Sequence, residues 1–127
     1  MAFTTIDDPS KFFQTVLYTG NGSSQSITFD GNSDMQPDFL WTKCRSDTFD
    51  PIIRDTSRGI SERLLVHAND AAGGATGTTA MNSDGFSLDS TNTVNNNNDT
   101  YVAWGWKCNG GTSSASGSES GSNVAYN

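Results

Sequence analysis

The stretch TYVAWGWK, residues 100–107, has the most regular alternation of side chains in the chain and decides its fold class. Successive side chains of a β-strand point to opposite faces. The alternation separates two sets of three residues, Val102, Trp104 and Trp106 on one face and Tyr101, Ala103 and Gly105 on the other. This pattern predicts a strand rather than a helix, and we expect it to be the strongest element of the domain.

Shorter strand-like stretches precede this segment and are separated by turn signals. We expect strands at residues 11–18, 25–29, 38–44, 51–55 and 86–88, and a strand or one helical turn feeding a strand at residues 62–67. The turn TGNGSS, residues 19–24, predicts that the first two strands form a hairpin or a near-hairpin. Many short strands and no long amphipathic helix predict an antiparallel β-sandwich.

The composition divides the chain of 127 residues into three parts. Residues 1–11 form a polar N-terminal extension, residues 12–110 form the sandwich, and residues 111–127 form a Gly/Ser-rich linker or tail. Inside the sandwich, residues 68–79 and the Asn-rich residues 92–99 are expected to be loops. A Gly/Ser-rich segment buries too little apolar surface to fold. We favour a tether to a further module over a plain disordered terminus.

The charge balance disfavours several classes of partner. The chain has a formal net charge of −7, and its seven Lys and Arg residues form no cluster. Such a surface repels a phosphate backbone, so nucleic-acid binding is not expected. No stretch approaches the roughly 20 apolar residues of a membrane span. The acidic N-terminus has no apolar signal-peptide core, so we expect synthesis in a bacterial cytoplasm.

The residue types needed for catalysis are sparse. His67 is the single histidine, and no nucleophile-elbow pattern accompanies it. One histidine with two distant cysteines provides no zinc spacing. Spacing alone does not exclude a carboxylate pair for glycoside hydrolysis, although most of the acids lie in turns. We therefore expect a non-enzymatic protein.

Calcium is the more serious ligand hypothesis, because loop oxygens are the ligands that Ca²⁺ takes. The candidate carboxylates are Asp70, Asp84, Asp89 and Asp99, with Asn69, Asn92 and residues 95–98 as neighbouring amides. There is no EF-hand spacing, and Asn-rich loops are usually turns. No cofactor is therefore expected.

The segment IIRDTSRG, residues 52–59, holds the densest group of charges. Arg54 and Arg58 are candidates for contact with a glycan or a partner, since guanidinium groups bind carboxylate or phosphate through two parallel hydrogen bonds. Arg45 is a candidate to approach them from the neighbouring strand. The favoured interpretation is an internal Arg–Asp pair, with Asp55, at the end of a strand.

The three tryptophans have two interpretations. Trp41, Trp104 and Trp106 are either core residues or a platform that contacts a glycan or a partner protein. Aromatic residues at strand spacing are more often part of the packing, so we expect at least two of the three in the core.

Cys44 and Cys108 each end a predicted strand, after WTK and GWK. If these two strands are neighbours, the cysteines are candidates for a disulfide. A bacterial cytoplasm keeps thiols reduced, so the bond would form only after lysis. The alternative, which we favour, is two buried thiols.

Five motifs occur in a characteristic order: YTGNGSSQSITF (residues 18–29), QPDFLWTKCRS (36–46), DTSRG (55–59), NSDGFSL (82–88) and NNNNDTYVAWGWK (95–107). This order resembles a repeated domain of marine bacteriophage proteins, from viruses of cyanobacteria and other ocean bacteria. Those proteins are long, contain similar repeats joined by Ser/Gly-rich linkers, and are described as tail-fibre-like or adhesin-like virion proteins. The resemblance covers residues 12–110.

The resemblance implies a concanavalin-like or SPRY-like sandwich on a virus particle, without established catalytic residues. We expect a structural virion module that anchors or displays a tail fibre or adhesin in host attachment. The alternatives are a capsid decoration protein or head fibre, and a carbohydrate-binding module; a glycan-degrading enzyme ranks last. The expected partners are other virion proteins, further copies of the chain in a homo-oligomer, and host cell-surface glycan.

Overall fold

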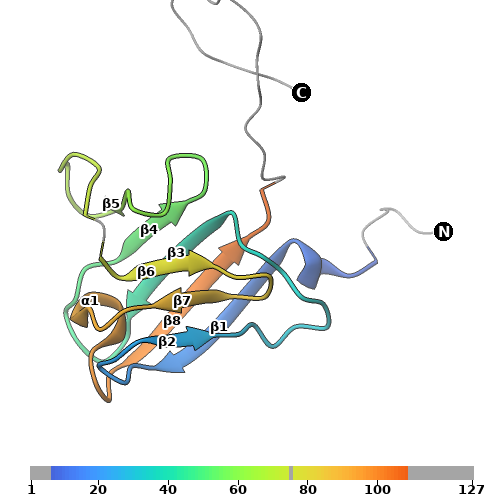
Figure 1. Cartoon of the computed structure of the whole chain (residues 1–127), viewed down its shortest axis with the longest axis horizontal. Helices are drawn as coiled ribbons and strands as arrows, with labels where there is room; N and C mark the ends of the chain where they lie inside the picture. Colours follow the sequence, from blue (N-terminus) through green and yellow to red (C-terminus); the bar gives the residue numbers. More distant parts are fainter. Residues whose placement is uncertain (1–6, 75, 109–127) are drawn as a thin grey trace, which may run out of the picture.

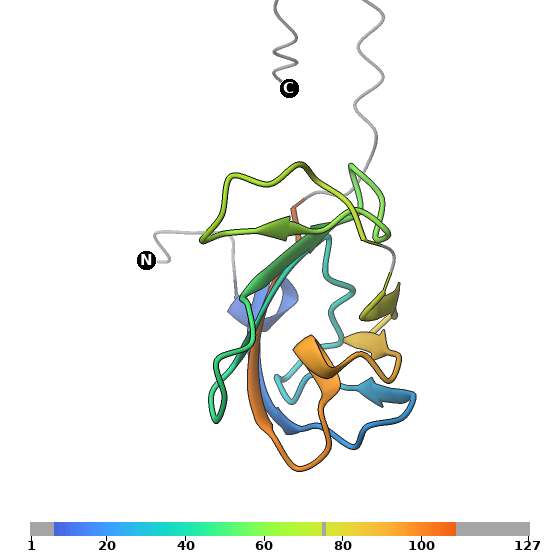
Figure 2. The same ribbon diagram turned by 90° about the vertical axis from the view of Figure 1, so that its left-hand side faces the viewer.

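The computed structural model describes residues 7–74 and 76–108, which form two antiparallel sheets stacked face to face (Figure 1), as the view along their edges shows (Figure 2). The larger sheet has the strand order β1 (Phe13–Thr19), β8 (Thr100–Trp106), β3 (Phe39–Cys44), β4 (Ile52–Asp55) and β5 (Leu64–Leu65). The smaller sheet has the order β2 (Gln25–Ile27), β7 (Phe86–Leu88) and β6 (Thr78–Met81). The helices are a 3-10 turn, η1 (Pro9–Lys11), and α1 (Asn92–Asn95). The predicted mostly-β sandwich is confirmed.

Strand β8 lies between β1 and β3 and pairs with both along its length. Its predicted alternation is correct, since Tyr101, Ala103 and Gly105 face the core and are buried. Gly105 has a packing reason: a Cβ built there would lie 2.5 Å from the Phe29 ring. Phe29 therefore packs directly against the backbone of β8 at Gly105.

The core lies between the two sheets and is built from aliphatic and aromatic side chains of both. Its buried members are Val16, Ile27, Phe29, Met35, Leu40, Ile52, Phe86, Leu88, Val94 and Ala103. Burying one large apolar side chain contributes roughly 1.5–3 kcal/mol. The strands predicted at residues 38–44, 51–55 and 86–88 are confirmed as β3, β4 and β7, and each turns alternate residues toward this core.

The predicted hairpin between the first two strands is wrong. Strand β1 pairs with β8 and β2 pairs with β7, so the turn after β1 crosses from one sheet to the other. The Gly20 N–H donates to the Asp99 carbonyl at 2.8 Å, and the Gly22 N–H donates to the Asn95 carbonyl at 3.0 Å. The turn is therefore held by the segment before β8 rather than by a neighbouring strand of its own.

Two elements occur where loops were expected, and one is shorter than expected. Strand β6 begins inside the predicted 68–79 loop, and α1 lies inside the predicted 92–99 loop. The helix is held by tertiary contacts, because the hydroxyls of Tyr18 and Tyr101 donate to the carbonyls of Val94 and Asn92, each at 2.7 Å. The element at residues 62–67 is reduced to the two residues of β5.

The ends of the chain are described only in part. Asp8 in the predicted N-terminal extension accepts the Ser33 hydroxyl at 2.6 Å, which attaches this segment to the loop after β2. The predicted linker at residues 111–127 lies outside the described residues. Within residues 7–74 and 76–108, no helix is long and apolar enough to span a membrane.

Asn95 is fully buried at the end of α1 and joins three segments of the chain. Its Nδ2 donates to the carbonyls of Ser23 and Asp89, both at 2.6 Å. Its Oδ1 accepts from the Asn21 N–H at 3.0 Å and from Gln25 Nε2 at 2.5 Å. The side chain thus uses its donors and acceptors fully to hold the crossing turn against α1.

Replacing Asn95 should destabilise the fold, because the Asn95→Ala substitution removes these bonds and leaves part-buried backbone groups without a partner. We expect the free energy of unfolding in urea to fall by about 3 kcal/mol. The control is Asn97→Ala in the same Asn run, where the side chain is exposed, and it should change stability by less than about 0.5 kcal/mol. Equal effects of the two substitutions would contradict this role for Asn95.

Candidate functional site

The side of the larger sheet that faces away from the smaller sheet carries five aromatic side chains, which we call the aromatic face. They are Phe13 from β1, Phe39 and Trp41 from β3, and Trp104 and Trp106 from β8. Strand register places Phe13, Trp106 and Phe39 in one row across the sheet, and Trp104 and Trp41 in the next. The second row continues through Ile53 to Leu64.

Ring contacts join the aromatic side chains within each row. The Trp106 ring lies between Phe13 and Phe39, with centroid distances of 4.9 Å and 5.3 Å. The rings of Trp41 and Trp104 are 5.3 Å apart. Phe13 is 42% exposed, and Leu64 at the far end of the second row is 38% exposed. An outer surface of this kind is typical of an interaction site.

The prediction that at least two tryptophans lie in the core is wrong. Trp41, Trp104 and Trp106 are half-buried and lie on the outer face. The sequence places Trp104 and Trp106 together on one face, but the inner side of β8 has no room for a side chain at Gly105, because Phe29 and Met35 lie against it. The interpretation of the tryptophans as a contact surface stays a prediction.

A hollow of about 330 Å³ opens at the end of the aromatic face where β3 begins, and Phe39 belongs to both features. Its lining is otherwise polar or charged: Asp38, Asp55, Thr56, Ser57, Arg58 and Cys108. Asp38 accepts the Cys108 N–H at 3.0 Å, and Lys107 Nζ lies 3.5 Å from the same carboxylate. The hollow thus combines one ring with hydrogen-bonding groups of both charges. No motif in the sequence indicated this hollow, although residues 55–58 lie inside the segment with the densest charges.

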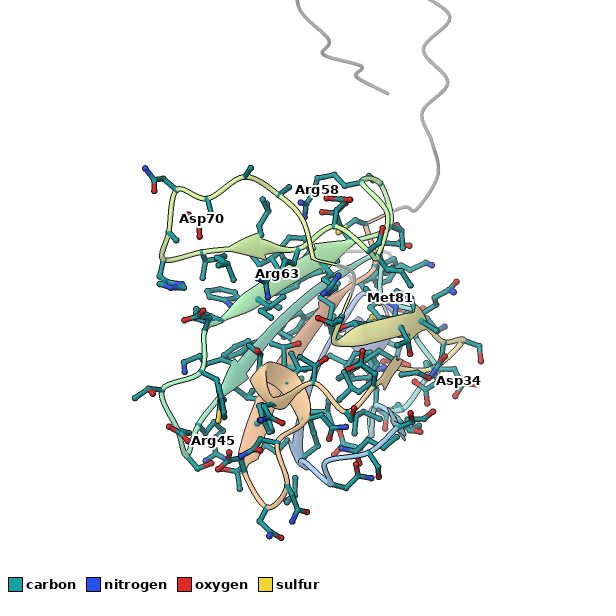
Figure 3. All side chains as sticks on the ribbon, turned by 60° about the vertical axis from the view of Figure 1, so that its left-hand side comes forward. Asp34, Arg45, Arg58, Arg63, Asp70 and Met81 are labelled. Carbon is teal, nitrogen blue, oxygen red and sulfur yellow. The ribbon has the colours of Figure 1, made fainter. Side chains whose placement is uncertain are left out.

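Arg58 forms the internal pair that the charge pattern suggested. Its Nε donates to Asp55 Oδ2 at 2.7 Å, and its backbone N–H donates to Asp55 Oδ1 at 2.8 Å. Arg45 does not approach this pair, because β3 runs antiparallel to β4 and Arg45 follows the opposite end of β3 (Figure 3). The hypothesis that Arg45 joins the cluster is therefore wrong.

Arg54 is 1% exposed and points into the molecule, away from Arg58. Its guanidinium donates to the carbonyls of Ile60, Gly74 and Thr76, the Gly74 bond measuring 3.0 Å. Burial, together with the nearby positive charge of Arg63, lowers the pKa of Arg54 below its ordinary value. Arg54 thus holds the 60–76 segment against the sheet and is not a surface contact for a glycan or partner.

The family of the chain follows from its sequence over almost the whole length. Residues 8–127 match the family described as a domain of unknown function, DUF7483. The chain belongs to this family. No curated protein and no solved structure matches the chain.

The four carboxylates proposed for calcium do not gather in this DUF7483 domain. Asp70 lies in an exposed loop (Figure 3), and Asp84 accepts the Met35 N–H at 3.3 Å. Asp99 accepts from Ser46 Oγ at 2.8 Å and from Asn96 Nδ2 at 2.6 Å. Among the described residues, no three His, Cys, Asp or Glu side chains are close enough to hold a metal ion. Asp84 and Asp99 therefore bind groups of nearby turns and loops.

Asp89, the fourth, anchors the loop that ends at Gly77. Its Oδ2 accepts the Gly77 N–H at 3.0 Å, and its Oδ1 accepts the Thr91 N–H at 2.8 Å. Burial raises the pKa of Asp89, but the bonds from Gly77 and Thr91 and the charge of Arg54 outweigh it, so the pKa is lowered from its ordinary value of 3.8. The ionised form of Asp89 is thus the form that the fold prefers.

The two cysteines of the DUF7483 domain are free, which contradicts the disulfide hypothesis. Strands β3 and β8 are indeed neighbours, but they are antiparallel, and Cys44 lies opposite Tyr101. Cys108 lies beyond the other end of β8, roughly 20 Å away at about 3.3 Å per residue. A disulfide needs Cα atoms within about 7 Å. Cys44 is buried as expected, whereas Cys108 is exposed.

The lowered pKa of Asp89 should make the fold less stable in acid. A carboxyl group with a depressed folded-state pKa stabilises the fold above its unfolded pKa, and that contribution is lost as pH falls through the folded pKa. Between about pH 5 and about pH 2, the free energy of unfolding in urea should fall more steeply for the wild type than for Asp89→Asn. Parallel pH profiles for the two proteins would contradict the assignment.

The thiols should differ sharply in accessibility. With an aromatic disulfide reagent, the folded protein should expose one reactive thiol, Cys108, and the urea-unfolded protein should expose two. Burial and the carboxylates of Asp38 and Asp55 raise the pKa of Cys108, so its reaction should speed up markedly above neutral pH. The variants Cys108→Ser and Cys44→Ser show which thiol gives each reaction. A native protein that does not react with the reagent and contains one disulfide by mass spectrometry would contradict the finding of two free thiols.

Proposed function

We propose that this domain is a non-enzymatic structural module of a bacteriophage virion, and that the aromatic face is the surface by which it docks on a neighbouring virion protein. The observation that carries the proposal is the double row of half-buried rings, ending in the exposed Phe13, on the outer side of the larger sheet. Tryptophan and other aromatic residues are enriched where protein interfaces gain most of their binding energy. Burial of rings at an interface removes a large apolar area from water.

The two outer faces of the sandwich differ in a way that supports this choice of surface. The smaller sheet turns hydroxyl groups outward, with Ser26 Oγ and Ser87 Oγ 3.0 Å apart. A shallow hollow on that sheet is lined largely by Ser, Thr and Gln side chains. Water solvates such a face well, whereas the aromatic face gains from being covered.

The resemblance of the motifs to marine phage repeats supports the place of the module on a virion. In this proposal the domain anchors or displays a tail fibre or adhesin and takes part in host attachment. A capsid decoration protein or head fibre uses the same docking face and differs only in its position on the particle. Further copies of the chain and other virion proteins are the partners.

A second function, glycan binding, is favoured by the hollow beside Phe39. Sugar sites combine a ring that stacks on the apolar side of a sugar with polar groups that bind its hydroxyls. Phe39, Thr56, Ser57 and the Asp55–Arg58 pair provide these groups in one place. This function ranks below docking because it uses one ring, whereas the aromatic face offers five.

The proposal predicts that the aromatic face is covered in the particle. Purified virions from the source should contain the chain by mass spectrometry, and electron cryomicroscopy should show the larger sheet turned toward a neighbouring subunit. Trp104→Lys, or the milder Leu64→Lys at an already exposed position, should lower the number of copies per particle about tenfold or more. Melting followed by circular dichroism establishes that each variant folds.

The matched control is Thr79→Lys, which adds the same charge to an exposed strand position of the smaller sheet and should leave the copy number unchanged. Density at the tail supports the fibre, and density on the shell supports decoration. Absence of the chain from purified particles would contradict the virion proposal and would leave glycan binding in first place.

A further inference from the structure

Strand β1 is the outermost strand of the larger sheet and pairs on one side only. Its partner is β8, and within residues 7–74 and 76–108 no strand pairs with its other side. In Figure 1 the strand lies at the lower border of the sheet. An unpaired strand edge presents a row of backbone N–H and C=O groups that another strand can bind.

Backbone hydrogen bonds at both ends of β1 show which residues point outward. The Phe12 carbonyl accepts the Lys107 N–H, and the Gly20 N–H donates to the Asp99 carbonyl, each at 2.8 Å. In an antiparallel pair, every second residue exchanges hydrogen bonds with the neighbouring strand. The even-numbered residues therefore bind β8, and the odd-numbered Phe13, Thr15 and Leu17 direct their N–H and C=O groups away from the sheet.

Within residues 7–74 and 76–108, no strand or loop backbone is hydrogen-bonded to the outward edge of residues 13–17. The loop after β2 is held on the inner side of β1, because the buried Gln14 side chain donates to the Ser33 carbonyl and accepts the Gly31 N–H, each at 2.8 Å. Phe13 is 42% exposed and Leu17 is 62% exposed. The unpaired edge thus carries exposed apolar side chains.

Strand β1 has none of the features that protect a sheet edge. Its seven residues, FQTVLYT, include no charge, no proline and no bulge. Natural edges are usually protected by lysines, prolines or bulges. The neutral edge also contrasts with the net charge of −7 of the chain, so two copies can approach there without bringing acidic side chains together.

We propose that β1 pairs antiparallel with β1 of a second copy around a two-fold axis at Thr15. In this register Phe13 lies opposite Leu17 of the second copy, Thr15 lies opposite its counterpart, and all three outward residues exchange backbone hydrogen bonds. A register shifted by one pair would place Phe13 opposite Thr19, whose carbonyl already accepts Gln25 Nε2 at 3.2 Å. The Thr15-centred register therefore gives hydrogen-bond partners to the outward N–H and C=O groups of β1. It also brings the Phe13 and Leu17 side chains of the two copies into contact.

The pairing would join the two larger sheets into one continuous sheet and extend both aromatic faces across the axis. This inference concerns the edge of the sheet and holds whether or not the aromatic face docks on a virion protein. The Leu64→Lys variant separates the two, because Leu64 lies on β5 at the opposite edge from β1. It should weaken docking on the particle and leave the dimer intact.

Sedimentation velocity of the full chain tests the dimer. The wild type should reach twice the 13.5 kDa mass of one chain as its concentration rises through the micromolar range. Leu17→Lys should raise the dissociation constant about tenfold or more, because it removes two cross-strand apolar pairs and adds a charge at the edge. Leu64→Lys is the matched control, since it also places a lysine at an exposed leucine of the same sheet face.

Cross-linking tests the register. In a background of Cys44→Ser and Cys108→Ser, Thr15→Cys should form an intermolecular disulfide, because opposed Cα atoms in such a pair are about 5.5 Å apart. Thr19→Cys should not form an intermolecular disulfide, because the Thr19 residues of the two copies do not lie opposite each other in this register. A wild type that stays monomeric, a dimer that Leu17→Lys leaves unchanged, or slow amide exchange at Phe13, Thr15 and Leu17 in the monomer would each overturn the proposal.

Discussion

The pairing of β8 with β1 on one side and β3 on the other is the interaction on which the rest of the structure depends. It aligns seven residues of β8 with β1 in unbroken register, and the same strand is paired with β3. Because Gly105 has no side chain on the inner side of β8, Phe29 and Met35 from the segment after β2 come close to the strand. Because its outer side is large, the tryptophans of β3 and β8 meet on the far face. The alternation of inward and outward side chains along β8 thus helps to form both the core and the aromatic face.

Buried polar side chains hold the parts of the domain that have little regular structure. Arg54 binds three carbonyls of the 60–76 segment, and Asn95 binds the turn that crosses between the sheets. A buried polar group is costly unless its hydrogen bonds are made, so each of these residues permits one arrangement of the surrounding loop and penalises others. A small chain with a modest apolar fraction can in this way order long loops that a hydrophobic core alone would leave free.

Local alternation made the fold class and the strands β3, β4, β7 and β8 predictable, because each side chain's face follows from its position along the strand. The alternation did not predict which strands pair with each other or in which direction each strand runs. The hairpin failed because β1 pairs with residues more than eighty positions away, and the disulfide failed because Cys44 and Cys108 end strands that run in opposite directions. For the site, the sequence indicated that Trp104 and Trp106 share a face. The pattern did not indicate which face was outward, since that depends on Phe29 in the segment after β2.

The register of β1 with β8 also has a mechanical consequence. Phe13 lies opposite Trp106, so the chain enters β1 and leaves β8 at the same end of the sheet. Tension applied at these two points would pull β1 and β8 apart from one end. The hydrogen bonds between the two strands would then break one after another, whereas a shear force would load all of them at once. The domain is therefore built to yield early under a pull along its own chain. A force applied through the aromatic face would instead be distributed over the many side-chain contacts of that face.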